Sequence, residues 1–129
     1  ARLRELGLGY RAAYVARTAE AVAGGEIDPG GLRGVTYGEA RETLMKLHWV
    51  GEQVADCVLL FALEKMESFP IDRWVKRALE RWDLGEGKLP YRDMASWAQA
   101  AFSPFAGYAQ QYLFYGRRLG RPGGRLPKP

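Results

Sequence analysis

The spacing of apolar residues is the feature that most limits the folds open to this chain. Between residues 52 and 64, apolar side chains recur three and four positions apart, at Val54, Cys57, Val58, Phe61 and Ala62. This spacing is typical of one face of an α-helix, and the opposite face is apolar as well, so we expect a central, buried helix. Because no segment alternates between polar and apolar residues as a half-buried strand does, the sequence predicts an all-α fold.

Glycine and proline residues divide the chain into short helices. We expect a compact bundle of about six, over residues 10–22, 36–47, 52–64, 73–82, 91–102 and 104–115. The bundle belongs to one helical domain, residues 1–115. Residues 116–129 are rich in glycine, proline and arginine, and because little of this segment can be buried we expect a basic, mobile tail.

Local signals mark several helix ends. Gly24 and Gly25 should stop the first helix. Thr36 and Glu39 have the spacing of a capping box, and Asp72 is a candidate N-cap for the helix over 73–82. That helix should turn three side chains inward, those of Trp74, Ala78 and Trp82.

Composition and charge bound the function. The chain has 129 residues, 47% of them hydrophobic, which suits one globular domain and argues against collagen-like, coiled-coil or disordered classes. No apolar run reaches the ~18 residues of a membrane-spanning helix, so no membrane partner is expected. The net charge of +4 comes from basic residues concentrated toward both ends. Such clustering suits a polyanion, and a solvated surface with a basic tail explains it equally well.

The chain has one cysteine, Cys57, and one histidine, His48. A single cysteine excludes an internal disulfide framework and a cysteine zinc site, and it favours a reducing, cytoplasmic compartment. A single histidine provides too few ligands for a metal site built from side chains. Because the sequence opens at Ala1 without methionine, we expect a fragment or a processed piece.

A four-residue interruption at 48–51 separates two of the predicted helices. Gly51 ends this hairpin, and the helix opening at Glu52 presents unpaired backbone N–H groups and the positive end of its dipole. Together these form a sequence-independent phosphate site. A hairpin of this kind is common, so by itself it is weak evidence for DNA binding.

Four motifs together resemble a known family. Residues 47–57, LHWVGEQVADC, resemble the helix-hairpin-helix element of the 8-oxoguanine DNA glycosylases, L-x-G-V-G-x-K-V-A-D-C. Residues 69–72, FPID, place Asp72 nineteen residues after Gln53, the family's spacing between its lysine and its catalytic aspartate. LGLGYRA at 6–12 and PFAGYAQ at 104–110, continuing to Phe114, resemble two further motifs in the family's order. The set is highly specific and implies the C-terminal helical portion of a base-excision repair enzyme.

The resemblance implies a mechanism. These enzymes extrude the damaged guanine from the duplex, a lysine amine displaces the base and forms a Schiff base, and an aspartate stabilises the positive charge on the sugar. Asp72 matches that aspartate, which is compatible with a plain N-cap role. Gln53 stands at the lysine position, and a neutral amide cannot form an imine. The chain should therefore bind the lesion but cleave poorly or not at all, whether Gln53 is natural or engineered; Lys46, before the hairpin, is not expected to substitute.

The resemblance also assigns recognition roles. Gln110 matches the residue that reads the extruded base, Phe114 the ring that stacks on it, and Cys57 the opposite wall of the pocket. Tyr10 matches the side chain that wedges into the duplex, and Arg11 a donor to the orphaned cytosine. Without the resemblance, Cys57 and Phe114 would be taken as core residues and the Tyr-Arg pair as helix surface.

Two positions depart from the family's DNA-binding residues. Trp49 replaces the first hairpin glycine, where a large side chain disfavours positive φ and crowds a phosphate; alternatively it is a packing residue. Trp74 replaces a phosphate-contacting histidine, although its indole N–H can still donate. Val50 and Gly51 retain the hairpin's DNA-binding positions. The resemblance further implies that hairpin carbonyls can hold a monovalent cation without side-chain ligands.

The implied partner is double-stranded DNA containing 8-oxoguanine opposite cytosine. The family's N-terminal β-rich portion is absent from this sequence, so we expect another chain or segment to supply it. Localisation would be cytoplasmic, at the nucleoid, in a prokaryote and nuclear in a eukaryote. Two alternatives stay open: a naturally non-catalytic lesion-binding module, and a glycosylase of the same superfamily for alkylated or mispaired bases. Gln110 with Phe114 favours oxidised guanine over the latter.

Overall fold

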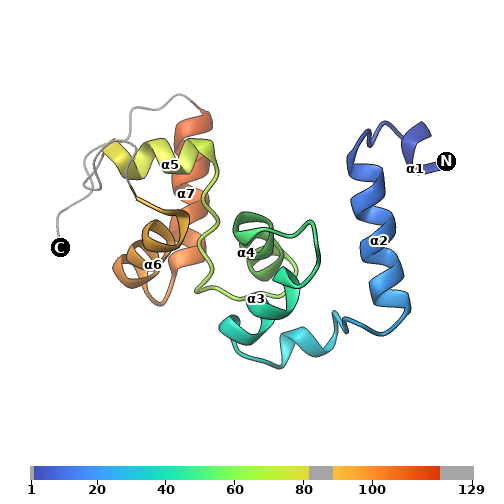
Figure 1. Ribbon diagram of the computed structural model, residues 1–129. Coiled ribbons are helices and arrows are strands. Elements are labelled where there is room, and N and C mark those ends of the chain that lie inside the picture. Colours follow the sequence, from blue (N-terminus) through green and yellow to red (C-terminus); the bar gives the residue numbers. More distant parts are fainter. Residues whose placement is uncertain (1, 82–88, 120–129) are drawn as a thin grey trace. The chain divides into compact units, whose positions relative to one another are not determined.

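The computed structural model describes residues 2–81 and 89–119, whose regular elements are all helices (Figure 1). In chain order they are α1 (Arg2–Glu5), α2 (Arg11–Ala23), the 3-10 helix η1 (Gly31–Arg33), α3 (Tyr37–Met45), α4 (Glu52–Phe61), α5 (Arg73–Leu79), α6 (Tyr91–Phe102) and α7 (Ala106–Arg118). No strand occurs within the described ranges, so the all-α prediction is confirmed.

The chain divides into two compact units, Ala1–Gly51 and Glu52–Pro129. The division falls at the end of the predicted hairpin. Helix α7 continues to Arg118, so the first residues assigned to the basic tail are helical. The rest of that tail, residues 120–129, lies outside the described residues, as does Trp82.

Local capping determines the helix ends in the first unit. The N–H groups of Gly25 and Glu26 donate to the carbonyls of Val22 and Ala21, and Gly25 has φ 74°, so α2 ends in a Schellman motif. At the start of α3, the Thr36 hydroxyl oxygen accepts from the N–H of Glu39, whose carboxylate accepts from the N–H of Thr36. Both end signals seen in the sequence are confirmed.

The core of the second unit gathers around the segment before α5. It is formed by apolar side chains from this segment and from α5, α6 and α7, namely Phe69, Ile71, Val75, Leu79, Met94, Ala95, Ala98 and Ala106. Helix α7 packs against α5 and α6. The first turn of α7 lies close to Leu60 and Met66 at Gly107. The N–H of Gly107 donates to the Met66 carbonyl, and a Cβ added at Gly107 would collide with the Leu60 side chain. This packing fixes the segment 69–72 between α4 and α7.

The expectation that α4 is buried on both faces is wrong. Val54 and Phe61 are 48% and 61% exposed, whereas the buried side chains are those of Ala55, Asp56, Leu59 and Leu60. Because both faces are rich in apolar residues, periodicity alone could not select the buried one. The expected inward position of Trp74 is also wrong, since 42% of its surface is exposed, while Ala78 is buried as expected.

Candidate active site

Gln53 lies in the first turn of α4 with its side chain exposed to solvent. The amide is uncharged, and its nitrogen lone pair is delocalised into the carbonyl. Because the side chain is exposed, an electrophilic sugar carbon could reach it. Because the lone pair is delocalised, Gln53 offers that carbon neither an amine nucleophile nor a base.

Asp72 is the N-cap of α5, as the sequence predicted. Its backbone is extended, with φ −88° and ψ −178°, and Oδ1 accepts a 2.7 Å hydrogen bond from the N–H of Val75. The carboxylate lies where the helix dipole favours negative charge. A fixed anion at this position can stabilise a positive charge that develops nearby.

The thiol of Cys57 responds to Asp72 electrostatically. Burial raises the pKa of Cys57, and the charges of Asp56 and Asp72 raise it further. The charge of Asp72 thus acts on the thiol of Cys57, which precedes it by fifteen positions in the sequence. The thiol is kept neutral, which suits a pocket wall better than a nucleophile.

Gln110 is buried on α7 and bonds to the segment that carries Asp72. Its Nε2 donates to the Pro70 carbonyl at 2.9 Å, and its Oε1 accepts from Gln111 Nε2 at 2.6 Å. The structure thus brings Gln110 to the residues just before Asp72. Phe114, one turn further along α7, is half-buried against the core, with its ring edge to face with Tyr115.

In the first unit, the wedge candidate Tyr10 immediately precedes α2 and is 67% exposed. The guanidinium of Arg11 lies 4.9 Å from the centroid of the Tyr10 ring, a cation–π arrangement. Arg11 is exposed as well. Both side chains are accessible to a partner.

Trp49 packs within a row of aromatic rings that was not predicted from the sequence. Its ring stacks on that of Tyr14 with the ring centroids 4.2 Å apart, and the His48 ring meets it edge to face with a centroid distance of 4.1 Å. The centroid of the Tyr14 ring in turn lies 5.7 Å from that of Tyr10. The signal available in the sequence was the i, i+4 spacing of Tyr10, the N-cap residue of α2, and Tyr14 in its first turns. These contacts favour the packing interpretation of Trp49.

The hairpin backbone is unstrained despite Trp49. Among the described residues, the only non-glycine residue with positive φ is Glu64, and Gly51 does not have positive φ either. The N–H of Val50 donates to the Leu47 carbonyl at 2.9 Å, and Gly51 is exposed. The expected conflict between a large side chain and a left-handed backbone is therefore absent at Trp49.

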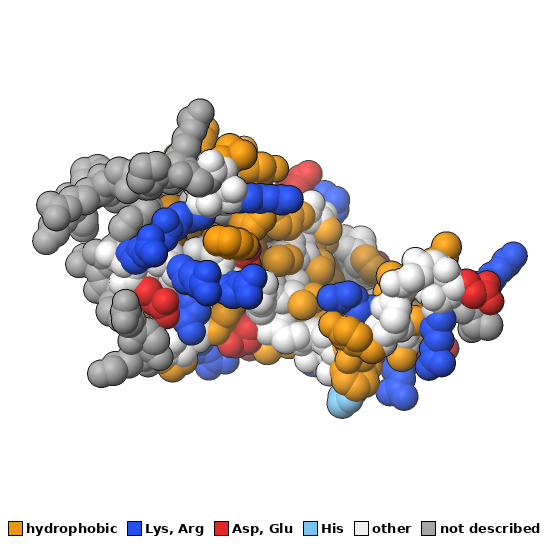
Figure 2. All heavy atoms as spheres, turned by 90° about the horizontal axis from the view of Figure 1, so that it is seen from above, with side chains coloured by type: hydrophobic (Ala, Val, Ile, Leu, Met, Phe, Trp, Pro, Cys, Tyr) orange, Lys and Arg blue, Asp and Glu red, His pale blue; other side chains and the backbone are white. Residues whose placement is uncertain are grey.

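Trp74 belongs to a basic and aromatic cluster on α5. The guanidinium groups of Arg73 and Arg77 lie 5.9 Å and 6.0 Å from the centroid of its ring. Figure 2 shows lysine and arginine side chains gathered beside exposed hydrophobic ones on the surface of this unit. Such a surface can contact a phosphate backbone and stack on a base.

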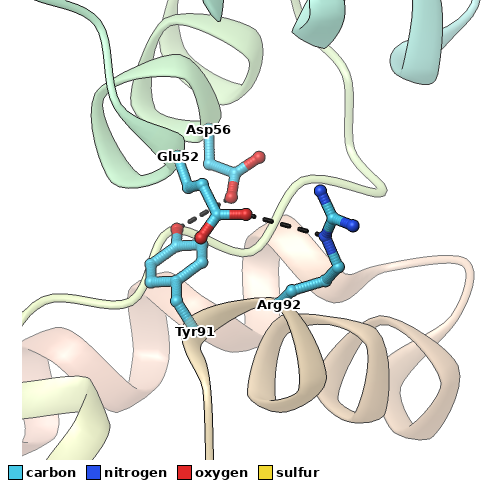
Figure 3. Close-up of polar contacts among 4 residues, drawn as sticks. All are labelled: Glu52, Asp56, Tyr91 and Arg92. Atoms are coloured by element: carbon cyan, nitrogen blue, oxygen red, sulfur yellow. Dashed lines mark hydrogen bonds and ion pairs between the residues drawn. The ribbon is translucent and has the colours of Figure 1, made fainter.

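A polar network centred on the bond between Asp56 and Tyr91 was not predicted from the sequence (Figure 3). Asp56 is fully buried, and its Oδ2 accepts a 2.7 Å hydrogen bond from the Tyr91 hydroxyl. That hydroxyl oxygen accepts from the Ile71 N–H at 3.2 Å, while Ser68 donates to the Asp56 carbonyl at 2.8 Å. No periodic pattern signals such a network, because its members are separated by up to 35 positions.

The described residues contain no group of three or more His, Cys, Asp or Glu side chains placed to hold a metal ion. Within the same ranges, no helix has both the length and the apolar character needed to cross a membrane.

Comparison with known proteins gives consistent relatives. The chain is 40% identical over 119 residues to a probable N-glycosylase/DNA lyase of Methanothermobacter thermautotrophicus, a match that covers 92% of this chain and 38% of that protein. It is 34% identical to an N-glycosylase/DNA lyase of Arabidopsis thaliana, with coverage of 86% and 33%. The chain thus spans less than half the length of either relative. No protein-family model matches it.

Solved structures agree with these relatives. The Clostridium acetobutylicum 8-oxoguanine glycosylase/lyase, in complex with double-stranded DNA containing cytosine opposite 8-oxoguanine, matches with a TM-score of 0.86 and 33% identity. That match covers 92% of this chain and 41% of the Clostridium chain. The same enzyme in its apo-form matches with a TM-score of 0.79.

Proposed function

Because this chain is homologous to a part of the 8-oxoguanine glycosylase/lyase family, we propose that it recognises 8-oxoguanine opposite cytosine in double-stranded DNA, and that Gln53 disables its excision chemistry. The observation that carries the proposal is the match over 92% of the chain to a glycosylase/lyase solved with such a duplex. Because the chain spans less than half the length of these relatives, the activity of the whole relatives comes to this chain only as part of the proposal.

The proposed chemistry assigns separate tasks to two positions. In an active enzyme an amine attacks C1′ of the damaged nucleotide, the glycosidic bond breaks, and the base leaves with its electron pair. Asp72, fixed at the N-terminus of α5 by its bond to Val75, would stabilise the positive charge on the sugar. The side chain of Gln53 is nearly as long as that of a lysine and could retain the shape of the pocket, but it cannot supply the amine.

The proposed base pocket draws on α4 and α7. Cys57 keeps a neutral thiol, which allows it to pack against an uncharged base, and Phe114 offers a half-buried ring. Gln110 is held by Pro70 and Gln111, and an extruded base would share or replace these partners. Recognition would then depend on a side chain that is already fixed in position.

Each of the two units offers residues for the proposed contacts with the duplex. In the first unit, Tyr10 would enter the space left by the extruded base and Arg11 would donate to the orphaned cytosine. The backbone of Val50 and Gly51 would lie against phosphate. In the second unit, Trp74 with its flanking arginines would add a further phosphate contact.

Restoring the amine tests this function. We expect the full chain carrying Gln53→Lys, incubated with an 8-oxoguanine:cytosine duplex and borohydride, to form a covalent protein–DNA adduct. The unchanged chain is the control and should bind the same duplex without forming the adduct. Tight binding without an adduct in the Gln53→Lys variant would instead identify a non-catalytic lesion-binding module. Equal binding to damaged and undamaged duplexes would contradict the proposed recognition of 8-oxoguanine.

A further inference from the structure

The hydroxyl group of Tyr91 connects two segments of the second unit whose relative position matters for the proposed function. It donates to Asp56 Oδ2 on α4 (Figure 3), and it accepts from the N–H of Ile71, the residue before Asp72. Asp56 follows Gln53 by three positions, so it lies about one turn further along the same helix. One oxygen atom thus joins the helix of the nucleophile position to the segment of the proposed charge-stabilising residue.

Burial makes this connection stiff. Asp56 and Ser68 are fully buried, and Ser68 also donates to the Asp56 carbonyl. The pKa of Tyr91 is raised well above its usual value by burial, by the charge of Asp56 and by the hydrogen bond to it. The hydroxyl therefore remains protonated and donating at every pH at which the protein would work. Losing it would leave a buried carboxylate oxygen and a backbone N–H without this partner, which is costly.

The segment before α5 is also held from its other neighbour. Gln110 on α7 donates to the Pro70 carbonyl, one residue before the N–H that Tyr91 accepts. The two bonds hold the carbonyl and the N–H of one peptide group, the one that joins Pro70 to Ile71, so the position of Asp72 follows from α4, α6 and α7 together. The nearby ion pair between Arg92 and Glu52 is longer, at 3.7 Å, and the Arg92 side chain is 74% exposed. Such a pair contributes little to position.

We propose that Tyr91, supported by Asp56, is a positioning residue that sets the place of Asp72 relative to the nucleophile position on α4. The geometry applies to the chain as it stands, and its catalytic meaning rests on the proposed function. Tyr91 touches neither Gln53 nor the substrate in this role, and it acts through the backbone of Ile71.

Amide hydrogen exchange tests the positioning without any enzymatic activity. In the full chain, we expect Tyr91→Phe to raise the exchange rates of the Ile71 and Val75 amides by about tenfold, the scale of one net hydrogen bond. Amides inside α6 and α7 should keep their rates. Arg92→Gln, which removes the neighbouring ion pair, and Tyr112→Phe, at a tyrosine that is 81% exposed, are the controls. An unchanged Val75 rate, or equal increases in all helices, would overturn the proposal.

Asp56 provides a second pair of variants that does not depend on Tyr91→Phe folding. Asp56→Asn keeps an acceptor oxygen for the hydroxyl, so the Ile71 and Val75 amides should stay within about threefold of their original rates. Asp56→Ala removes that acceptor and should raise both rates as Tyr91→Phe does. Rapid exchange at both amides in Asp56→Asn would contradict the role given to this acceptor.

Activity then separates positioning from binding. In the Gln53→Lys background, Tyr91→Phe should lower the single-turnover excision rate by about tenfold while leaving the dissociation constant for the duplex unchanged. An equal loss in rate and in affinity would overturn the positioning role. If Gln53→Lys shows no excision at all, the proposed chemistry fails, while hydrogen exchange still decides whether Tyr91 positions Asp72.

Discussion

At the scale of single residues, Asp72 combines two tasks in one side chain. The bond from Val75 to Oδ1 caps α5, an interaction that is generally worth about 1 kcal/mol. Burial raises the pKa of the Cys57 thiol, and the charge of the same Asp72 carboxylate is among the effects that raise it further. A capping residue is thus placed where its charge can also act on chemistry, so the structural and the proposed catalytic roles do not compete.

The reactivity of Cys57 should report this charge. Because burial and the two carboxylates raise its pKa, the thiol stays protonated to higher pH than the ~8.5 of a free cysteine. We expect alkylation by iodoacetamide at pH 8 to be slower in the folded chain than in denaturant. Asp72→Asn, which can still cap α5, should shift the pH profile of the rate to lower pH.

The matched control for this measurement is Asp93→Asn, since Asp93 is exposed on α6 and does not contribute to the shift. It should leave the profile where it is. If Asp72→Asn also left the profile unchanged, the effect of the Asp72 charge on the thiol would be refuted.

At the scale of elements, helix ends were predictable and helix faces were not. The capping box of α3, the N-cap of α5 and the stop after α2 depend on residues within a few positions of each other, so sequence alone specifies them. The buried face of α4 includes Asp56, whose carboxylate accepts a hydrogen bond from Tyr91, 35 positions later. No local pattern contains that information, and a buried aspartate contradicts ordinary apolar periodicity.

The candidate site divides in the same way. Its residues were indicated by the spacing of four motifs, and the structure brings Gln110 to the segment that carries Asp72. Their supports were not predictable, because Tyr14, Asp56 and Tyr91 act through contacts between elements. Trp49 shows the limit most clearly: its conflict with a hairpin glycine was visible in the sequence, but its stacking on Tyr14 was not.

The stacking between Trp49 and Tyr14 should stabilise the first unit measurably. Removing either ring should lower the free energy of unfolding, and a double-mutant cycle with Trp49→Ala and Tyr14→Ala should give a coupling of about 1 kcal/mol. Urea titrations followed by NMR signals of residues in the first unit would measure it. Val22→Ala, at a valine that is 40% exposed and about two turns further along α2, is the control and should not couple to Tyr14. Additive effects of Trp49→Ala and Tyr14→Ala would mean that the stack contributes nothing to stability.

At the scale of the whole molecule, the net charge is +4, and in each unit some of the arginines that contribute to it lie beside an aromatic ring. Arg11 lies against the exposed ring of Tyr10, and Arg73 and Arg77 flank Trp74. Each cluster pairs a guanidinium with an accessible aromatic ring, which is the combination that binds phosphate and stacks on an unpaired base. The arrangement is compatible with the nucleic-acid partner of the proposed function.

Salt dependence of duplex binding tests this use of charge. Each arginine that neutralises a phosphate releases counterions, so the logarithm of the association constant should fall linearly with the logarithm of salt concentration. Replacing Arg73 or Arg77 with glutamine should weaken binding to all sequences alike and make the slope less steep by about one. Arg33→Gln, in η1 and outside both clusters, should leave the slope unchanged. Because these contacts read the phosphate backbone, the change should be equal for lesion-containing and undamaged duplexes. A flat salt response of the unchanged chain would refute the polyanion argument, and a slope altered only for the lesion duplex would place these arginines at the base instead.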